Sequence, residues 1–204
     1  MRVISGTAKG RPLKAVPGMG TRPTTDKVKE AVFSMIGPYF DGGQTLDLFA
    51  GTGGLGIEAL SRGMERAVFI DIEKTSIGVI RHNLQATGLE QRAEVYRNEA
   101  SRAIAALSKR EIRFDLVFLD PPYKLRTVDQ LMQKLQEADL LAPNACVVAE
   151  HDTETTYSDT VGGLACVRRS VYGETAITVY RLQGASTLAE AAPAVAMTEG
   201  METE

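Results

Sequence analysis

The sequence predicts an α/β fold with a doubly wound, mostly parallel sheet. From residue 44 onward, short apolar segments alternate with segments whose apolar residues recur at helical spacing, which is typical of repeated strand–helix units. The segment Phe114–Leu119 is apolar along almost its whole length, as expected for a parallel strand covered on both faces. Glycine-rich and acidic residues follow directly after several predicted strands, where ligands bind in sheets of this kind.

The first predicted elements are a basic β-hairpin and a helix. Residues 2–5 and 11–16 are expected to form two short strands around the turn Thr7–Gly10, and a loop follows at Pro17. Thr24 or Thr25 then caps a helix that ends at Gly37-Pro38. The helix repeats apolar residues on one face, at Val28, Ala31, Val32 and Met35.

The predicted core extends from residue 44 to residue 182. Its parallel strands are expected at Thr45–Phe49, Ala67–Ile72, Ala93–Tyr96, Phe114–Leu119 and Ala145–Ala149. The helices between them are expected at Leu55–Ser61, Lys74–Thr87, Ala100–Leu107 and Val128–Ala138. Residues 165–172 and 175–182 read as an antiparallel pair that closes the sheet.

Composition bounds the class of protein. The chain has 204 residues, of which 44% are hydrophobic and 24% charged, and this excludes a fibrous, mostly disordered or membrane-bundle protein. We expect one domain over residues 1–182, followed by an acidic tail, residues 183–204, that is too poor in large apolar residues to fold. No signal core opens the chain, so a cytoplasmic protein is expected. Cys146 and Cys166 lie in apolar stretches and are interpreted as core residues, and no Cys/His spacing predicts a metal site.

Charge is distributed unevenly along the chain. The net charge is −3, but the tail alone carries −4 and the remainder therefore +1. The first 22 residues contain no acid and carry +5, which indicates an anionic partner such as nucleic acid. The candidate phosphate-contacting residues are Arg2, Lys9, Arg11, Lys14 and Arg22.

A glycine-rich loop follows the first core strand. Gly51, Gly53 and Gly56 match the spacing GxGxxG, in which glycines let the backbone turn tightly and approach a ligand at a helix N-terminus. Asp71 follows 20 residues after Gly51, at the end of the next strand, where an acid can bind ribose hydroxyls. Together they predict an adenosine-containing cofactor.

Two further acids bear on which cofactor binds. Asp47 lies four residues before Gly51, and an acid at that position favours a cationic cofactor, S-adenosylmethionine, over NAD. Glu99 follows the third strand and could reach the adenine amino group or cap the next helix, and the sequence leaves both readings open.

The most apolar strand ends in Asp120-Pro121-Pro122-Tyr123. An exocyclic amine of a nucleobase is a poor nucleophile, and a carboxylate with a backbone carbonyl can accept its two N–H bonds and orient its lone pair. Asp120 would supply the carboxylate and Pro121 the carbonyl, while the successive prolines, Pro121 and Pro122, stiffen the turn. Tyr123 would stack on the extruded base. The run predicts methyl transfer to a base amino group.

These motifs resemble those of class I, Rossmann-like S-adenosylmethionine-dependent methyltransferases. The resemblance is narrower over residues 2–182, where several further runs occur in order, and it points to the RsmD family of bacterial enzymes that methylate guanine N2 in 16S ribosomal RNA. Those runs are Ile4-Ser5-Gly6, Lys9-Gly10-Arg11, Arg22–Asp26, Leu55–Gly63 and Tyr172–Thr175. The resemblance implies cofactor binding by Asp47, Gly51, Gly53, Asp71 and Glu99, and catalysis by Asp120–Tyr123. Asp71 departs from the family pattern, in which we expect Glu, and the acidic tail has no counterpart.

The resemblance also implies a partner, ribosomal RNA or an assembling small subunit, bound by a chain that we expect to be a monomer. The residues alone indicate only a base amino group. An adenine or cytosine amino-methyltransferase acting on DNA or another RNA therefore stays open, as does a non-catalytic RNA-binding assembly factor. An NAD-dependent oxidoreductase is disfavoured by Asp47 and by the tetrapeptide.

Overall fold

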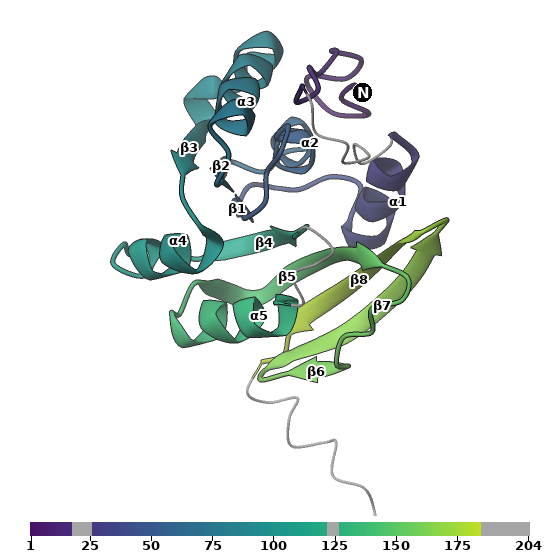
Figure 1. Cartoon of the computed structure of the whole chain (residues 1–204), viewed down its shortest axis with the longest axis vertical. Coiled ribbons are helices and arrows are strands. Elements are labelled where there is room, and N and C mark those ends of the chain that lie inside the picture. The colour runs from purple at the N-terminus through teal and green to yellow at the C-terminus, as the bar shows by residue number, and fades with distance from the viewer. Residues whose placement is uncertain (18–25, 122–126, 185–204) are drawn as a thin grey trace, which may run out of the picture.

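The computed structural model describes residues 1–17, 26–121 and 127–184. Its centre is one eight-stranded sheet with the order β3-β2-β1-β4-β5-β8-β7-β6 (Figure 1). The strands β1 to β5 are parallel, and β8, β7 and β6 continue the sheet in antiparallel pairs. The predicted doubly wound, mostly parallel fold is confirmed.

The strands and helices of the core match the predicted elements closely. The parallel strands are β1 (Gln44–Asp47), β2 (Arg66–Asp71), β3 (Ala93–Arg97), β4 (Phe114–Leu119) and β5 (Leu141–Asp152), and the antiparallel ones are β6 (Thr160–Val161), β7 (Leu164–Tyr172) and β8 (Thr175–Leu182). The helices are α1 (Asp26–Ile36), α2 (Gly54–Ser61), α3 (Lys74–Thr87), α4 (Ala100–Leu107) and α5 (Val128–Glu137), with a short 3₁₀ turn at Glu90–Arg92. Strand β6 was not expected, and β5 is longer than predicted because its second half pairs with β8.

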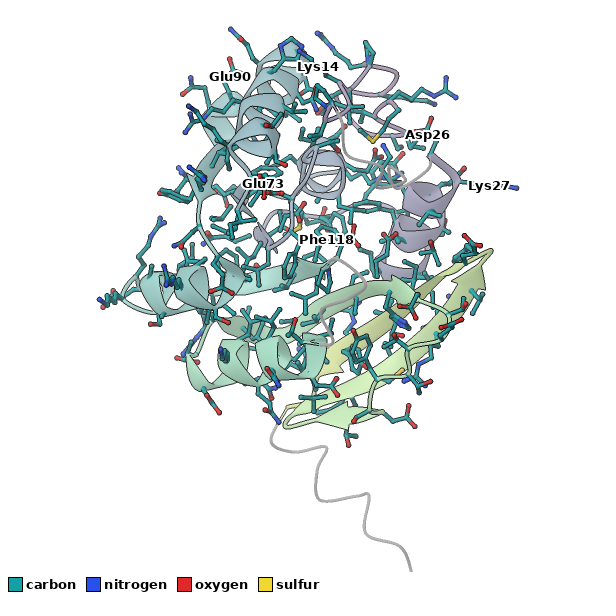
Figure 2. All side chains as sticks on the ribbon, viewed as in Figure 1. Lys14, Asp26, Lys27, Glu73, Glu90 and Phe118 are labelled. Carbon is teal, nitrogen blue, oxygen red and sulfur yellow. The ribbon has the colours of Figure 1, made fainter. Side chains whose placement is uncertain are left out.

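Alternation along the strands divides the core into two layers. Val68 and Ile70 of β2 pack against α4 and α5, whereas Ala67 and Phe69 face α2 and α3. Phe118 of β4, at the centre of the molecule in Figure 2, belongs to the layer beneath α1 and α2. Since both faces of the sheet are covered there, β2 and β4 are apolar on both sides, whereas the edge strand β3 is half-exposed.

Helix α1 buries a face that overlaps the predicted one in part, at Val28 and Val32. Its buried apolar residues are Val28, Val32, Phe33 and Ile36, while Ala31 and Met35 are only partly buried. Lys29 is also fully buried, which no apolar periodicity can indicate. The predicted cap residues Thr24 and Thr25 lie outside the described residues.

The N-terminal hairpin is present but shorter than predicted. An antiparallel bridge joins Arg2 to Pro12, and the Val3 N–H donates to the Arg11 carbonyl at 2.9 Å, but no regular strand extends over residues 2–5 or 11–16. The pairing stops after Val3 because the backbone N–H groups of Ile4 and Ser5 donate to the side chain of Glu58, at 2.8 and 2.9 Å. The basic segment, defined here as residues 1–17, is therefore a short hairpin held on α2 and α3 (Figure 1).

The described helices include none that is both long enough and apolar enough to cross a membrane. The described part of the chain also contains no group of three or more metal-ligating side chains.

Candidate active site

The candidate site lies where the direction of the sheet's winding reverses. The chain proceeds outward from β1 through β2 to β3, and then returns to place β4 and β5 on the other side of β1. The crevice outside the carboxyl ends of β1 and β4 is thus a topological switch point, which is the usual ligand site of such sheets. Asp47, Asp71 and Asp120 all lie at this edge, because each ends or directly follows a parallel strand.

The glycine loop connects β1 to α2 in the conformation that glycine favours. Gly51 and Gly53 have positive φ values of 53° and 78°, and Gly53 is the N-cap residue of α2. Gly56 is needed for a different reason: a Cβ atom there would lie 2.3 Å from Cε1 of Phe69 in β2. The first two glycines shape the turn, and the third permits close packing of helix on strand.

Asp71 stabilises this loop directly. One oxygen of its carboxylate accepts the Gly51 N–H at 2.8 Å, and the other accepts the Glu73 N–H at the same distance. The structure therefore brings together the glycine loop and the acid that the sequence placed in one site. Carboxylate oxygens can accept further hydrogen bonds, so Asp71 keeps acceptor capacity for hydroxyl groups.

Asp47 lies beneath the loop and is almost completely buried. Its Oδ2 accepts the Gly56 N–H at 3.3 Å. Burial raises the pKa of Asp47 to about 7, and the nearby Asp71 adds to the shift while backbone N–H groups oppose it. A cation bound at this edge would favour the ionised form, so the site suits a positively charged ligand.

Glu99 is the N-cap residue of α4. Its carboxylate accepts the backbone N–H groups of Ser101 and Arg102 at 2.9 and 3.0 Å, and the first of these bonds is the main cause that lowers the pKa of Glu99. The helix-cap reading is confirmed. Contact of this exposed side chain with adenine stays a prediction.

Asp120 follows β4, beside two other acids. Burial raises the pKa of Asp120 well above its ordinary value, and the carboxylates of Glu150 and Asp47 raise it further. Because Leu119 pairs with Ala149, Asp120 and Glu150 follow in the same row of neighbouring strands. Pro121 is buried next to Asp120, and Pro122 and Tyr123 lie outside the described residues.

Sequence reasoning missed Glu150, which is buried and belongs to the same edge. The signal was present, because Glu150 directly follows the apolar run Val147–Ala149, just as Asp120 follows Phe114–Leu119. The rule that acids follow strand ends therefore applies to Glu150 as it does to Asp120, because the predicted strand Ala145–Ala149 ends one residue before it.

The basic segment lies over α2 and α3 (Figure 1). Lys14 is joined through Asn83 to the Thr52 carbonyl in the glycine loop, whereas Nη1 of Arg11 donates to the Ala86 carbonyl near the C-terminal end of α3 at 3.1 Å. Lys9, Arg11 and Lys14 are exposed, and Figure 2 shows Lys14 where the segment passes α3. Arg2 is also exposed, but its guanidinium pairs with Asp26 at 3.4 Å. Arg22 lies outside the described residues. Four of the five predicted phosphate-contacting residues are thus gathered on one side of the fold.

A hollow of about 310 Å³ lies at the opposite end of the parallel strands, between Gly43, Asp115 and Ala145. These residues lie at or just before the N-terminal ends of strands, or early in them. The hollow is therefore separated from the acids of the candidate site by the length of the strands.

Fold and site together define a class I methyltransferase, with the glycine loop after β1, an acid after β2 and an Asp-Pro-Pro-Tyr run after β4. A family model described as "Conserved hypothetical protein 95" matches residues 1–181. The chain belongs to this family, which contains the RsmD ribosomal RNA methyltransferases.

Two curated relatives show how near the match is. A Bacillus subtilis (strain 168) protein, YlbH, provisionally named an rRNA methyltransferase, is 53% identical over 90% of this chain and 100% of its own length. Ribosomal RNA small subunit methyltransferase D of Escherichia coli (strain K12) is 32% identical over 89% of each chain. A solved Escherichia coli structure, provisionally described as the methyltransferase yhhF, superimposes with a TM-score of 0.76 at 32% identity, covering 90% of this chain and 98% of that one.

Proposed function

We propose that this protein transfers a methyl group from S-adenosylmethionine to the exocyclic N2 amine of a guanine in small-subunit (16S) ribosomal RNA. The observation that carries the proposal is the set of acids at one switch point, with Asp47 and Asp71 at the glycine loop and Asp120 one strand away. The curated relatives support ribosomal RNA as the substrate, because their names give rRNA methylation as the activity. The choice of guanine N2 follows from the family resemblance.

The residues present fit S-adenosylmethionine. This cofactor supplies an electrophilic methyl group on a sulfonium sulfur, and it carries an ammonium group and a ribose. Asp71 has acceptor capacity for ribose hydroxyls, and the glycine turn at Gly51 and Gly53 lets the backbone approach the ligand. Asp47 supplies negative charge beneath the loop for a cationic ligand.

Asp120 is suited to bind and deprotonate an amine. Its raised pKa makes it a stronger base than an exposed carboxylate, and the amine nitrogen must lose one proton when it gains the methyl group. In the proposed arrangement Asp120 accepts one N–H bond of the amine and the Pro121 carbonyl accepts the other, which orients the lone pair. Tyr123 is proposed to stack on the base.

The basic segment is proposed to contact RNA phosphates through Arg2, Lys9, Arg11, Lys14 and Arg22. Such contacts position the RNA without reading its bases, and they weaken steeply with salt. The exposed side chains of Lys9, Arg11 and Lys14 support this role.

The test is transfer of a radiolabelled methyl group to three acceptors: small subunits from unmethylated cells, free ribosomal RNA and duplex DNA. We expect label on a guanine N2 of a ribosomal acceptor. Asp120→Ala should lower the rate by at least about 100-fold, the order of a lost acid–base group, while S-adenosylmethionine binding measured by calorimetry is kept.

Three other results of this experiment would contradict the proposal. Label on DNA alone would move the substrate to the rival amino-methyltransferase reading. Binding of ribosomal RNA without any transfer would support an assembly factor. Near-normal turnover of Asp120→Ala would remove Asp120 from the mechanism.

A further inference from the structure

Glu58, on α2, holds the basic segment to the body of the protein. Its side chain is fully buried, and each carboxylate oxygen accepts one backbone N–H and faces one cation. Oε2 accepts the Ile4 N–H at 2.8 Å and lies 3.6 Å from Nζ of Lys29. Oε1 accepts the Ser5 N–H at 2.9 Å and the Arg62 Nε–H at 2.8 Å.

The two cations that face Glu58, Lys29 and Arg62, make further contacts that hold this part of the protein together. Lys29 of α1 is fully buried and donates to the carbonyl of Arg2, so α1 also holds the segment. Burial lowers the pKa of Lys29, and Glu58 and Asp26 oppose that shift. Arg62 donates to the Pro38 carbonyl at 2.9 Å. A buried carboxylate is tolerated only with such partners, and here two of those partners are backbone groups of the basic segment.

Ser61, about one turn further along α2, continues the same contact. Its Oγ donates to the Ser5 carbonyl at 2.6 Å and accepts the Ala8 N–H at 2.9 Å, and its carbonyl accepts the Thr7 N–H at 2.8 Å. Gly6 lies so close that a Cβ atom there would be 1.8 Å from the Ser61 carbonyl oxygen. Residues 4–8 are thus fixed on α2 immediately before the exposed Lys9.

The same frame carries the glycine loop, because α2 begins there. Asn83 of α3 is fully buried and joins the two parts. Its Nδ2 donates to the Thr52 carbonyl in the loop at 2.9 Å and to the Lys14 carbonyl at 3.0 Å. The position of the basic segment is therefore defined relative to the cofactor loop.

We propose that Glu58 is a positioning residue for the RNA substrate. By holding the backbone of Ile4 and Ser5 on α2, it fixes Lys9 and Arg11 relative to the glycine loop, so that RNA phosphates bound there bring the target base to Asp120. The inference rests on the proposed function, since it requires an RNA that the basic segment contacts. This positioning also gives a role to the sequence run Leu55–Gly63, of which only the first residues belong to the cofactor site.

The central test is Glu58→Gln. Removal of a negative charge by itself strengthens RNA binding, so weaker binding must come from lost positioning. We expect a higher KM for RNA with unchanged kcat and an unchanged Kd for S-adenosylmethionine. The dependence of RNA affinity on salt should also become less steep. Each lost phosphate contact lowers the slope of log K against log salt by about 0.7 to 0.9, so loss of both Lys9 and Arg11 lowers it by about 1.4 to 1.8.

Glu94→Gln is the matched control. Glu94 on β3 pairs with Arg110 at 2.9 Å, away from the basic segment, and its substitution changes the net charge by the same amount. We expect its RNA affinity and salt slope to equal or slightly exceed those of the parent protein.

A double-variant comparison separates this inference from the proposed function. In protein carrying Lys9→Ala and Arg11→Ala, Glu58→Gln should cause little further loss of RNA affinity, because the contacts it positions are already gone. If the lysine and arginine changes alone leave RNA affinity intact at low salt, the proposed RNA contacts are wrong. If they weaken RNA binding but Glu58→Gln has no effect, or an effect that simply adds to theirs, the positioning role is wrong.

Ser61→Ala provides a second route if Glu58→Gln does not fold. It removes the Oγ bonds to Ser5 and Ala8 without changing charge. The same fall in salt slope, at unchanged cofactor affinity, is expected. An unchanged slope in Ser61→Ala, with a melting curve like the parent's, would contradict the inference.

Discussion

At the scale of single residues, the surroundings of each carboxyl group decide what it can do. Asp47 is buried under a loop and has a pKa raised to about 7, whereas Glu99 is exposed, accepts two backbone N–H groups and has a lowered pKa. Asp71 lies between them in the chain and uses both oxygens on the glycine turn. All three were placed in one cofactor site by their positions after strands. Only their contacts show that one supplies buried charge, one stabilises the loop and one caps a helix.

The raised pKa of Asp47 predicts a pH dependence of stability. An acid whose folded pKa is raised contributes stability that is complete below its unfolded pKa, near 3.8, and is lost as pH rises through about 7. Asp47→Asn removes this titration, so the variant should gain stability relative to the parent between pH 5 and pH 8, by about 3 kcal/mol. Urea denaturation at pH 5 and pH 8 measures the difference in free energy of unfolding between the variant and the parent. Titrating groups that the two proteins share cancel in this difference. A constant difference would contradict the assigned pKa.

At the scale of elements, the packing of α2 on β2 depends on the absence of a side chain at Gly56. The helix must lie close to the sheet for its N-terminus to reach the cofactor edge, and the ring of Phe69 occupies the space that a Cβ would need. The basic segment shows a second effect of packing. Its backbone groups bond to side chains of α2 and α3, and the predicted hairpin is therefore limited to the short antiparallel pairing around Arg2 and Pro12.

Gly56→Ala should therefore destabilise the protein, by about 1 to 3 kcal/mol, as overpacking of a core does. Gly78→Ala is its control, because Gly78 lies in the exposed face of α3 and a Cβ there meets nothing within 4 Å. The control should be neutral or stabilising by up to about 1 kcal/mol, since alanine favours helix. Thermal unfolding compares the two. Equal melting temperatures would show that α2 can move away from β2 without cost.

At the scale of the whole molecule, the site exists because the chain reverses its direction of winding between β3 and β4. Strands distant in sequence, β1 and β4, become neighbours, and their acids meet at one edge. The basic segment reaches the same side because α1, α2 and α3 all contribute residues that hold it. The described molecule carries its basic segment on α2 and α3, the helices that flank the glycine loop, and its acids at the carboxyl edge of the sheet. This arrangement suits a polyanionic substrate and a cationic cofactor.

The acidic tail is expected to add nothing to this arrangement. A chain ending at Gly184 keeps every strand of the sheet and loses a segment poor in large apolar residues, so its melting temperature should lie within about 2 °C of the parent's. Loss of the tail's charge of −4 should leave RNA affinity equal or higher. Calorimetry measures the melting temperature, and RNA titration measures the RNA affinity. A clear fall in either quantity would assign the tail a structural or binding role.

The sequence by itself determined the doubly wound fold, the glycine loop with Asp47 and Asp71, and the position of Asp120 after the most apolar strand. These features are local: periodicity, turn residues and strand ends are written in neighbouring positions. Tertiary structure alone decided the burial of Lys29 in α1, the pairing of β5 with β8, and the attachment of the basic segment to Glu58. Each of these depends on contacts between residues far apart in the chain, such as the 54 positions between Ile4 and Glu58, and local patterns carry no information about such contacts.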